Sequence, residues 1–151
     1  TINIYRIGKN KVLNLFQANI LKNIIGYIYF TELRIKQQLG YSTSGKILSE
    51  GEFLYFTIIV QGSRVPPNTV NEKIEELVSK MRERIVKVKK SGLTKAIKVA
   101  KKKLKLKDKT LKKRTERIWR KVLLKDLGFK EAKEVKRFER KVTKNKLLAF
   151  F

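Results

Sequence analysis

Two side chains that can donate hydrogen bonds, Arg34 and Tyr41, stand on either side of a predicted corner in the stretch ELRIKQQLGY, residues 32–41. The stretch begins with good helix formers and stops at Gly40, where a left-handed helix cap costs little. The residues alone leave two interpretations open. The pair is functional, or Arg34 pairs with Glu32 or a sheet-edge carbonyl and Tyr41 is a core aromatic whose hydroxyl lies at the rim.

The chain lacks the residue types that most catalytic mechanisms use. None of its 151 residues is a histidine or a cysteine. The usual general base, the usual zinc ligands, disulfide bonds and Ser-His or Cys-His nucleophiles are therefore absent. The thirteen acidic residues are scattered, with no cluster of the calcium-loop kind. We expect no catalytic residue, no metal site and no cofactor in this chain, and we do not expect it to be a self-contained hydrolase.

The net charge of +25 lies mainly in the second part of the chain. Residues 1–65 carry eight basic and three acidic residues (+5), whereas residues 66–151 carry thirty and ten (+20). Such a surface attracts polyanions, so nucleic acid or an anionic membrane is a candidate partner, although a merely solubilising surface also explains the charge. The candidate polyanion-binding residues are Lys101, Lys102, Lys103, Lys105, Lys112, Lys113 and Arg114.

The apolar pattern predicts the elements that position these side chains. Alternation predicts a strand over residues 2–7, and spacings of three and four predict a helix over residues 11–29. Residues 42–49 and 53–61 are predicted to form a hairpin, with Gly51 in its turn at a positive φ. The second hairpin strand is apolar on both faces in its middle, which predicts a central position in the sheet.

Helices are predicted to follow the Val-Pro-Pro-Asn break at residues 65–68. Thr69 and Glu72 form a capping box at the start of a long helix, which Gly92 ends. Its core-facing residues are predicted to be Val70, Ile74, Leu77, Met81, Ile85 and Val88.

Three further threonines are predicted helix caps: Thr31 before the corner, Thr94 after Gly92, and Thr143 near the end. Two more helices are expected between the last two caps, the first closed by Gly128. Their predicted core-facing residues are Leu111, Ile118, Trp119 and Val122 in the first and Ala132, Val135, Phe138 and Val142 in the second.

The order of elements predicts an α+β fold, an antiparallel sheet with helices packed on one face. We expect a single domain over residues 1–151 that lacks edge elements at both ends. No stretch reaches the length of a membrane span. The final LLAFF is expected to be exposed unless a partner buries it, which indicates a piece of something longer.

Three stretches together resemble the insulin-degrading-enzyme and pitrilysin (insulinase, M16) metallopeptidases. ELRIKQQLGYSTSG is similar to the Leu-Arg helix and Gln-Leu-Gly-Tyr corner of their last domain, and a hairpin follows as in that family. FTIIVQGSRVPPNTVNEKIEELVSKM resembles their strand, Pro-Pro break and long helix, and RIWRKVLLKDLGF is a weaker match. The resemblance runs from about Asn10 to Phe151 and is most specific from Arg34 to Tyr41.

The resemblance implies a fold, a role and partners. In that family two halves form a clamshell, zinc is bound by His-x-x-Glu-His in the first domain, and the last domain holds no metal. The implied fold of this chain is an insulinase-like or mitochondrial-processing-peptidase-like domain. Carried over to this sequence, Arg34 and Tyr41 are substrate-binding residues that donate to the peptide backbone near the scissile bond. The implied partners are the catalytic N-terminal half, in the same or a separate chain, and a peptide substrate.

Two departures from the family keep a second function open. The chain has no zinc motif, and its helical half is more basic than peptide binding requires. The first hypothesis is a non-catalytic C-terminal domain that grips substrate and closes the chamber. The second is a repurposed insulinase-like domain whose basic helices bind RNA, a ribonucleoprotein or another polyanion, and docking on anionic lipid is a weaker third. The absence of cysteine permits a reducing compartment, so an intracellular, cytosolic location is favoured.

Overall fold

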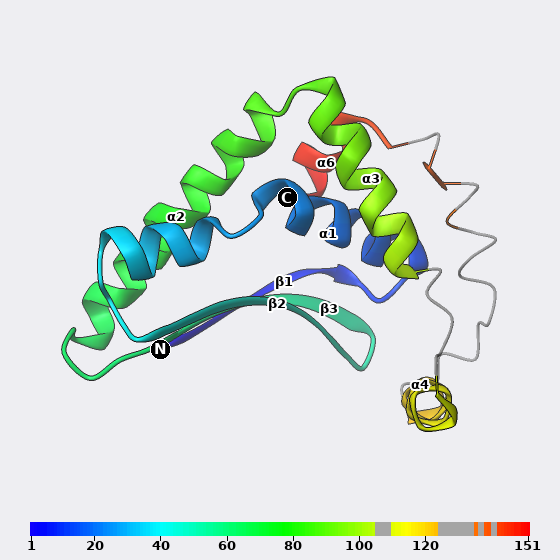
Figure 1. Ribbon diagram of the computed structural model, residues 1–151, viewed down its shortest axis with the longest axis horizontal. Coiled ribbons are helices and arrows are strands. Elements are labelled where there is room, and N and C mark those ends of the chain that lie inside the picture. The colour runs from blue at the N-terminus through cyan, green and yellow to red at the C-terminus, as the bar shows by residue number, and fades with distance from the viewer. Residues whose placement is uncertain (105–109, 124–134, 136–137, 140–141) are drawn as a thin grey trace.

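In the part of the chain that the structure describes, a three-stranded antiparallel sheet has helices packed on one face, as the sequence predicts (Figure 1). The computed structural model describes residues 1–104, 110–123, 135, 138–139 and 142–151. Among these residues, no helix combines the length and the apolar character needed to span a lipid bilayer.

The sheet consists of β1 (Ile2–Lys9), β2 (Ser42–Glu50) and β3 (Phe53–Gln61), in the order β1-β3-β2. The central position of β3 confirms the prediction from its apolar residues. A two-residue turn joins β2 to β3, and Gly51 takes a φ of 54° in it, because that positive angle suits a residue without a Cβ.

Helix α1 (Val12–Ile25) packs on the sheet and is shorter than predicted. It ends because Gly26 has a φ of 64°, and the predicted extension to residue 29 is therefore wrong. Tyr29 is nevertheless buried in the core, which also contains Phe16 of α1 and Ile58 of β3.

Helix α2 (Pro67–Lys87) crosses the same face of the sheet but begins three residues earlier than predicted. Pro66 precedes it and Pro67 is its first residue, a position where proline's missing N–H is not needed. Thr69 therefore lies inside the first turn, and the predicted capping box is wrong. The predicted core-facing residues are confirmed: Val70, Ile74, Leu77, Met81 and Ile85 are buried and Val88 is half-buried.

Helix α3 (Lys90–Leu104) begins before Gly92, contrary to the prediction that this glycine separates two helices. The chain breaks instead at Val88, whose φ and ψ of −63° and 127° are extended. Thr94 is therefore not a cap, since it lies inside α3 and its Oγ1 donates to the carbonyl of Lys90 at 3.0 Å.

The side chains predicted to face the core from helix α4 (Leu111–Leu123) are mostly exposed. Of these four predicted residues, Leu111 is 80% exposed, Trp119 is 61% exposed, Val122 is exposed as well, and Ile118 is half-buried. In Figure 1, α4 lies apart from the sheet and the other labelled helices. The amphipathic spacing thus predicts the helix correctly but not the surface that it faces.

The last helix, α6 (Lys144–Phe150), has the predicted cap. The Thr143 hydroxyl accepts from the Lys146 backbone N–H at 3.3 Å. Leu147 is buried and Phe150 and Phe151 pack against the core, so the expected exposure of the apolar end is wrong. Of the helix predicted before it, Val135 is buried and Phe138 and Val142 are half-buried, and Ala132 lies outside the described residues. Gly128, the predicted end of the preceding helix, also lies outside them.

A polar contact joins β1 to α2 across the covered face of the sheet. The Tyr5 hydroxyl donates to Oε1 of Glu75 at 2.6 Å, and Asn3 Nδ2 donates to Oδ1 of Asn71 at 2.7 Å. Burial, and then the hydrogen bond to Glu75, raise the pKa of Tyr5 to about 12. The opposite face of β1 leaves Ile2 and Ile4 exposed.

Candidate functional site

The segment that carries Arg34 is a π-helix, η1 (Phe30–Lys36), rather than the predicted ordinary helix. Tyr29 precedes it, so Thr31 lies within it and is not its cap. Leu33 is fully buried, whereas Arg34 is exposed. The short π-helix therefore anchors the segment in the core through Leu33 and leaves the neighbouring Arg34 in solvent. Single-turn π-helical segments are frequent at functional sites.

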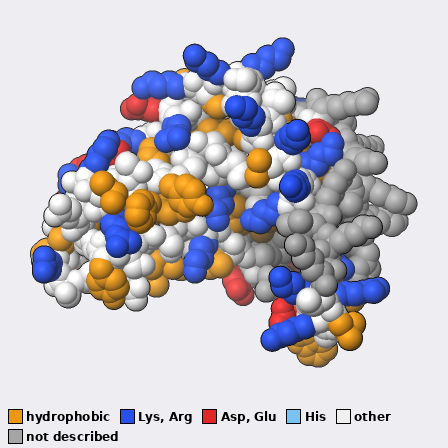
Figure 2. Space-filling view, viewed as in Figure 1, with side chains coloured by type: hydrophobic (Ala, Val, Ile, Leu, Met, Phe, Trp, Pro, Cys, Tyr) orange, Lys and Arg blue, Asp and Glu red, His pale blue; other side chains and the backbone are white. Residues whose placement is uncertain are grey.

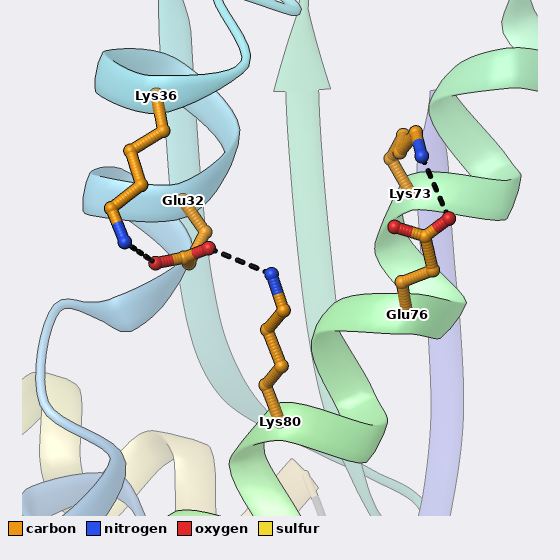
Figure 3. Close-up of polar contacts among 5 residues, drawn as sticks. All are labelled: Glu32, Lys36, Lys73, Glu76 and Lys80. Carbon is orange, nitrogen blue, oxygen red and sulfur yellow. Dashed lines mark hydrogen bonds and ion pairs between the residues drawn. The ribbon is translucent and has the colours of Figure 1, made fainter.

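Glu32 holds η1 against α2. Its Oε1 accepts from Lys36 Nζ at 2.6 Å and its Oε2 accepts from Lys80 Nζ of α2 at 2.9 Å (Figure 3). The hydrogen bonds from Lys36 and then from Lys80 lower the pKa of the Glu32 carboxyl. Among the described residues, Glu32 pairs with these two lysines and not with Arg34, so the alternative pairing of Arg34 with Glu32 is wrong.

Arg34 instead lies over an aromatic ring. Its guanidinium carbon is 5.3 Å from the centroid of Phe30, within the range of a cation–π interaction. Within the described part of the chain, Arg34 forms no ion pair, so its N–H groups remain available to a ligand. Stacking on Phe30 limits the side chain's freedom without using those donors.

The corner is built differently from the prediction for Gly40. The left-handed residue is Gln38, with a φ of 51°, and Gly40 is needed for a close approach of backbone to backbone. A Cβ on Gly40 would lie 2.3 Å from the carbonyl oxygen of Gln61, and one on Gly62 would lie 2.8 Å from that of Leu39. The two glycines thus let the corner press against the end of β3.

An open hollow of about 490 Å³ lies at this contact; we call it the corner hollow. Arg34 and Tyr41 both line it, and Tyr41 is 66% exposed, which excludes the alternative of a core tyrosine. The prediction from sequence thus names two residues that the fold brings to one surface. What they bind stays a prediction.

The corner hollow also contains residues that the sequence analysis missed. Gln38, Ser63 and Arg64 line it together with the predicted pair. Arg64 is exposed and enters the site because Ser42, next to Tyr41, pairs with Gln61 in the β2–β3 register. In the sequence, the one feature that could have indicated Arg64 is the position of Gly-Ser-Arg directly after a predicted strand.

The candidate polyanion-binding residues do not form one free cluster. Lys101 forms an ion pair with Glu139, and Lys103 Nζ donates to Oδ1 of Asn19 at 2.9 Å. Figure 2 shows Lys and Arg side chains spread over the visible face rather than gathered in one patch. The other candidates divide as follows: Lys102, Lys112, Lys113 and Arg114 are exposed, and Lys105 lies outside the described residues.

The described residues contain no group of three or more Asp or Glu side chains placed to hold a metal ion. The chain also has no histidine or cysteine to supply other ligands. The residues present therefore do not fit the zinc site of the resembled family.

The fold defines the class of this protein. The crystal structure of pitrilysin matches 99% of the chain with a TM-score of 0.81 at 14% sequence identity, which shows that the two share a fold. The chain spans 16% of the length of that pitrilysin chain. The class is thus a pitrilysin-like α+β domain.

A family model described as PQQ synthase PqqF-like, C-terminal lobe domain 4, matches residues 20–119. The chain belongs to this family of C-terminal-lobe domains of M16, insulinase-type peptidases. The resemblance seen in the sequence is confirmed. No curated protein matches the sequence.

Proposed function

We propose that this chain is a non-catalytic domain of a zinc metallopeptidase, in which Arg34 and Tyr41 bind the backbone of a peptide substrate and the domain closes the catalytic chamber. One observation carries the proposal: two hydrogen-bond donors from either side of the corner line one open hollow. Membership in an M16 C-terminal-lobe family supports a peptide as the ligand.

Zinc and the hydrolytic residues are, in this proposal, supplied by a catalytic half outside this chain. The domain's own contribution is electrostatic. A guanidinium and a phenol that donate to a peptide carbonyl stabilise negative charge developing on its oxygen, and they also fix the position of the backbone. Gly40 and the stacking of Arg34 on Phe30 orient the two donors before the peptide binds.

The test is made in the complete peptidase that contains this chain. Arg34→Ala and Tyr41→Phe should each lower kcat/KM for a neutral peptide about 10- to 100-fold, because each removes a donor to the reacting backbone. Arg82→Ala is a matched control, since Arg82 is exposed on α2 and does not line the corner hollow. Unchanged turnover in both site variants would contradict the assigned roles.

Polyanion binding is kept as the second candidate function because of the exposed Lys112, Lys113 and Arg114 on α4. If these groups bind a phosphate backbone, the affinity should fall steeply as salt is added, since counterion release drives such binding. Titration of labelled single-stranded RNA at rising salt measures this slope. Absence of binding at low salt would exclude this candidate and leave the peptidase proposal untouched.

A further inference from the structure

Two guanidinium groups line the corner hollow: Arg34 reaches it from η1 and Arg64 reaches it from the segment after β3. Among the residues that the structure describes, no Asp or Glu lines it. The nearby acid in the sequence, Glu32, is held by Lys36 and Lys80 and does not line the hollow. A hollow with two fixed positive charges and no compensating negative one attracts an anion.

We infer that the corner hollow binds a carboxylate of the peptide, through Arg64 together with Arg34. This rests on the proposed function and extends it to the class of substrate. The planar guanidinium presents paired N–H donors that match the two oxygens of a carboxylate, and the hydroxyl of Ser63 can complete its hydrogen bonding while Tyr41 donates to the backbone. Arg64 is thus a specificity-determining residue, and acidic peptides are the preferred ligands.

The carboxylate has two sources, an Asp or Glu side chain or the C-terminus of the peptide. Both are tested in the complete peptidase with matched peptides that differ only by Glu or Gln, or only by a free or an amidated C-terminus. The acidic member of one pair should have a kcat/KM about 10-fold higher, as expected for one additional charged hydrogen-bonded pair. Whichever pair shows the ratio identifies the source.

Arg64→Gln should bring this ratio close to one, and Arg64→Glu should reverse it in favour of a peptide with Lys at the same position. Arg64 is exposed, so neither change disturbs the core. Arg82→Gln on α2 makes the same change of charge away from the hollow and should leave the ratio intact. Added salt should lower the ratio in the unsubstituted protein, because the charges are open to solvent.

Failure of this inference is distinguishable from failure of the proposed function. If neither pair of peptides shows a ratio above one, or Arg64→Gln leaves the ratio unchanged, the inference is wrong. The proposed function still holds in that case if Arg34→Ala and Tyr41→Phe lower turnover of the neutral peptide. Fluorescence anisotropy with a labelled acidic peptide measures binding without turnover; equal affinity for the unsubstituted protein and Arg64→Gln would also overturn the inference.

Discussion

At the scale of single residues, the contact between Gly40 and Gln61 determines the shape of the corner. The carbonyl of Gln61 occupies the space that any side chain at position 40 would need. The glycine therefore sets how close Tyr41 comes to Gly62 and Arg64, and it does so by its lack of a Cβ rather than by a left-handed conformation. The positive φ is taken by Gln38, a residue whose long side chain makes that angle less favourable.

Gly40→Ala is expected to lower the free energy of unfolding by about 1–3 kcal/mol, because the added Cβ forces the corner away from β3. Urea unfolding of the variant and the unsubstituted chain measures the difference. Gly51→Ala is the comparison, since a Cβ there meets nothing within 4 Å and only the positive φ opposes it. A smaller decrease in the free energy of unfolding for Gly40→Ala than for Gly51→Ala would contradict the close-approach explanation.

At the scale of elements, η1 holds its position through a buried leucine and an ion pair to a neighbouring helix. Leu33 packs in the core, while Glu32 reaches Lys80 on α2. Lys73 and Glu76 form a second pair in the same region, but both lie on α2, so that pair joins no two elements (Figure 3). The position of Arg34 thus depends on a contact between segments that are remote in sequence.

Glu32→Gln should destabilise the chain at neutral pH and have little effect in acid. The pKa of Glu32 is below its ordinary value of 4.5 in the folded state, so its stabilising contribution is present above that value. The contribution is lost as the pH falls through the lower folded-state pKa. Unfolding midpoints in urea at pH 7 and near pH 3 measure the effect, with Glu76→Gln as a control of smaller effect. If the variant lowers the unfolding midpoint by the same amount at both pH values, the ion pair between Glu32 and Lys80 does not stabilise the chain.

At the scale of the whole molecule, positive charge and exposed apolar surface meet on α4. Lys112, Lys113 and Arg114 are exposed on the same helix as Leu111 and Trp119. Trp119 is the one tryptophan in the sequence, so the chain's tryptophan fluorescence reports on this helix alone.

The fluorescence of Trp119 in the 151-residue chain should be that of an exposed indole, with red-shifted emission. Iodide should quench it severalfold more strongly than caesium, because the neighbouring cations attract the anion and repel the cation. The difference should shrink in 0.5 M salt, where charges are screened over only a few ångströms. Blue-shifted emission that neither ion quenches would show that the indole is buried.

Local patterns predict much of this fold because they record which face of an element meets the core. The hairpin, the central strand and the buried face of α2 follow from period-two and three-to-four spacing. The starts of helices are less predictable: Thr69 is a good cap by type, but Pro67 begins the helix two residues before it. For α4, periodicity shows an apolar face without showing what that face contacts.

The sequence by itself determined the α+β class and the absence of histidine and cysteine ligands, since these depend on residue type and local spacing, and its resemblance to the family named the two candidate donors. Only the tertiary structure decided why Gly40 is a glycine, that Glu32 pairs with Lys80 rather than with Arg34, and that Arg64 joins the hollow. Each of these depends on contacts between residues far apart in the chain. Such contacts are set by strand register and by the packing of one element on another, which local patterns do not specify.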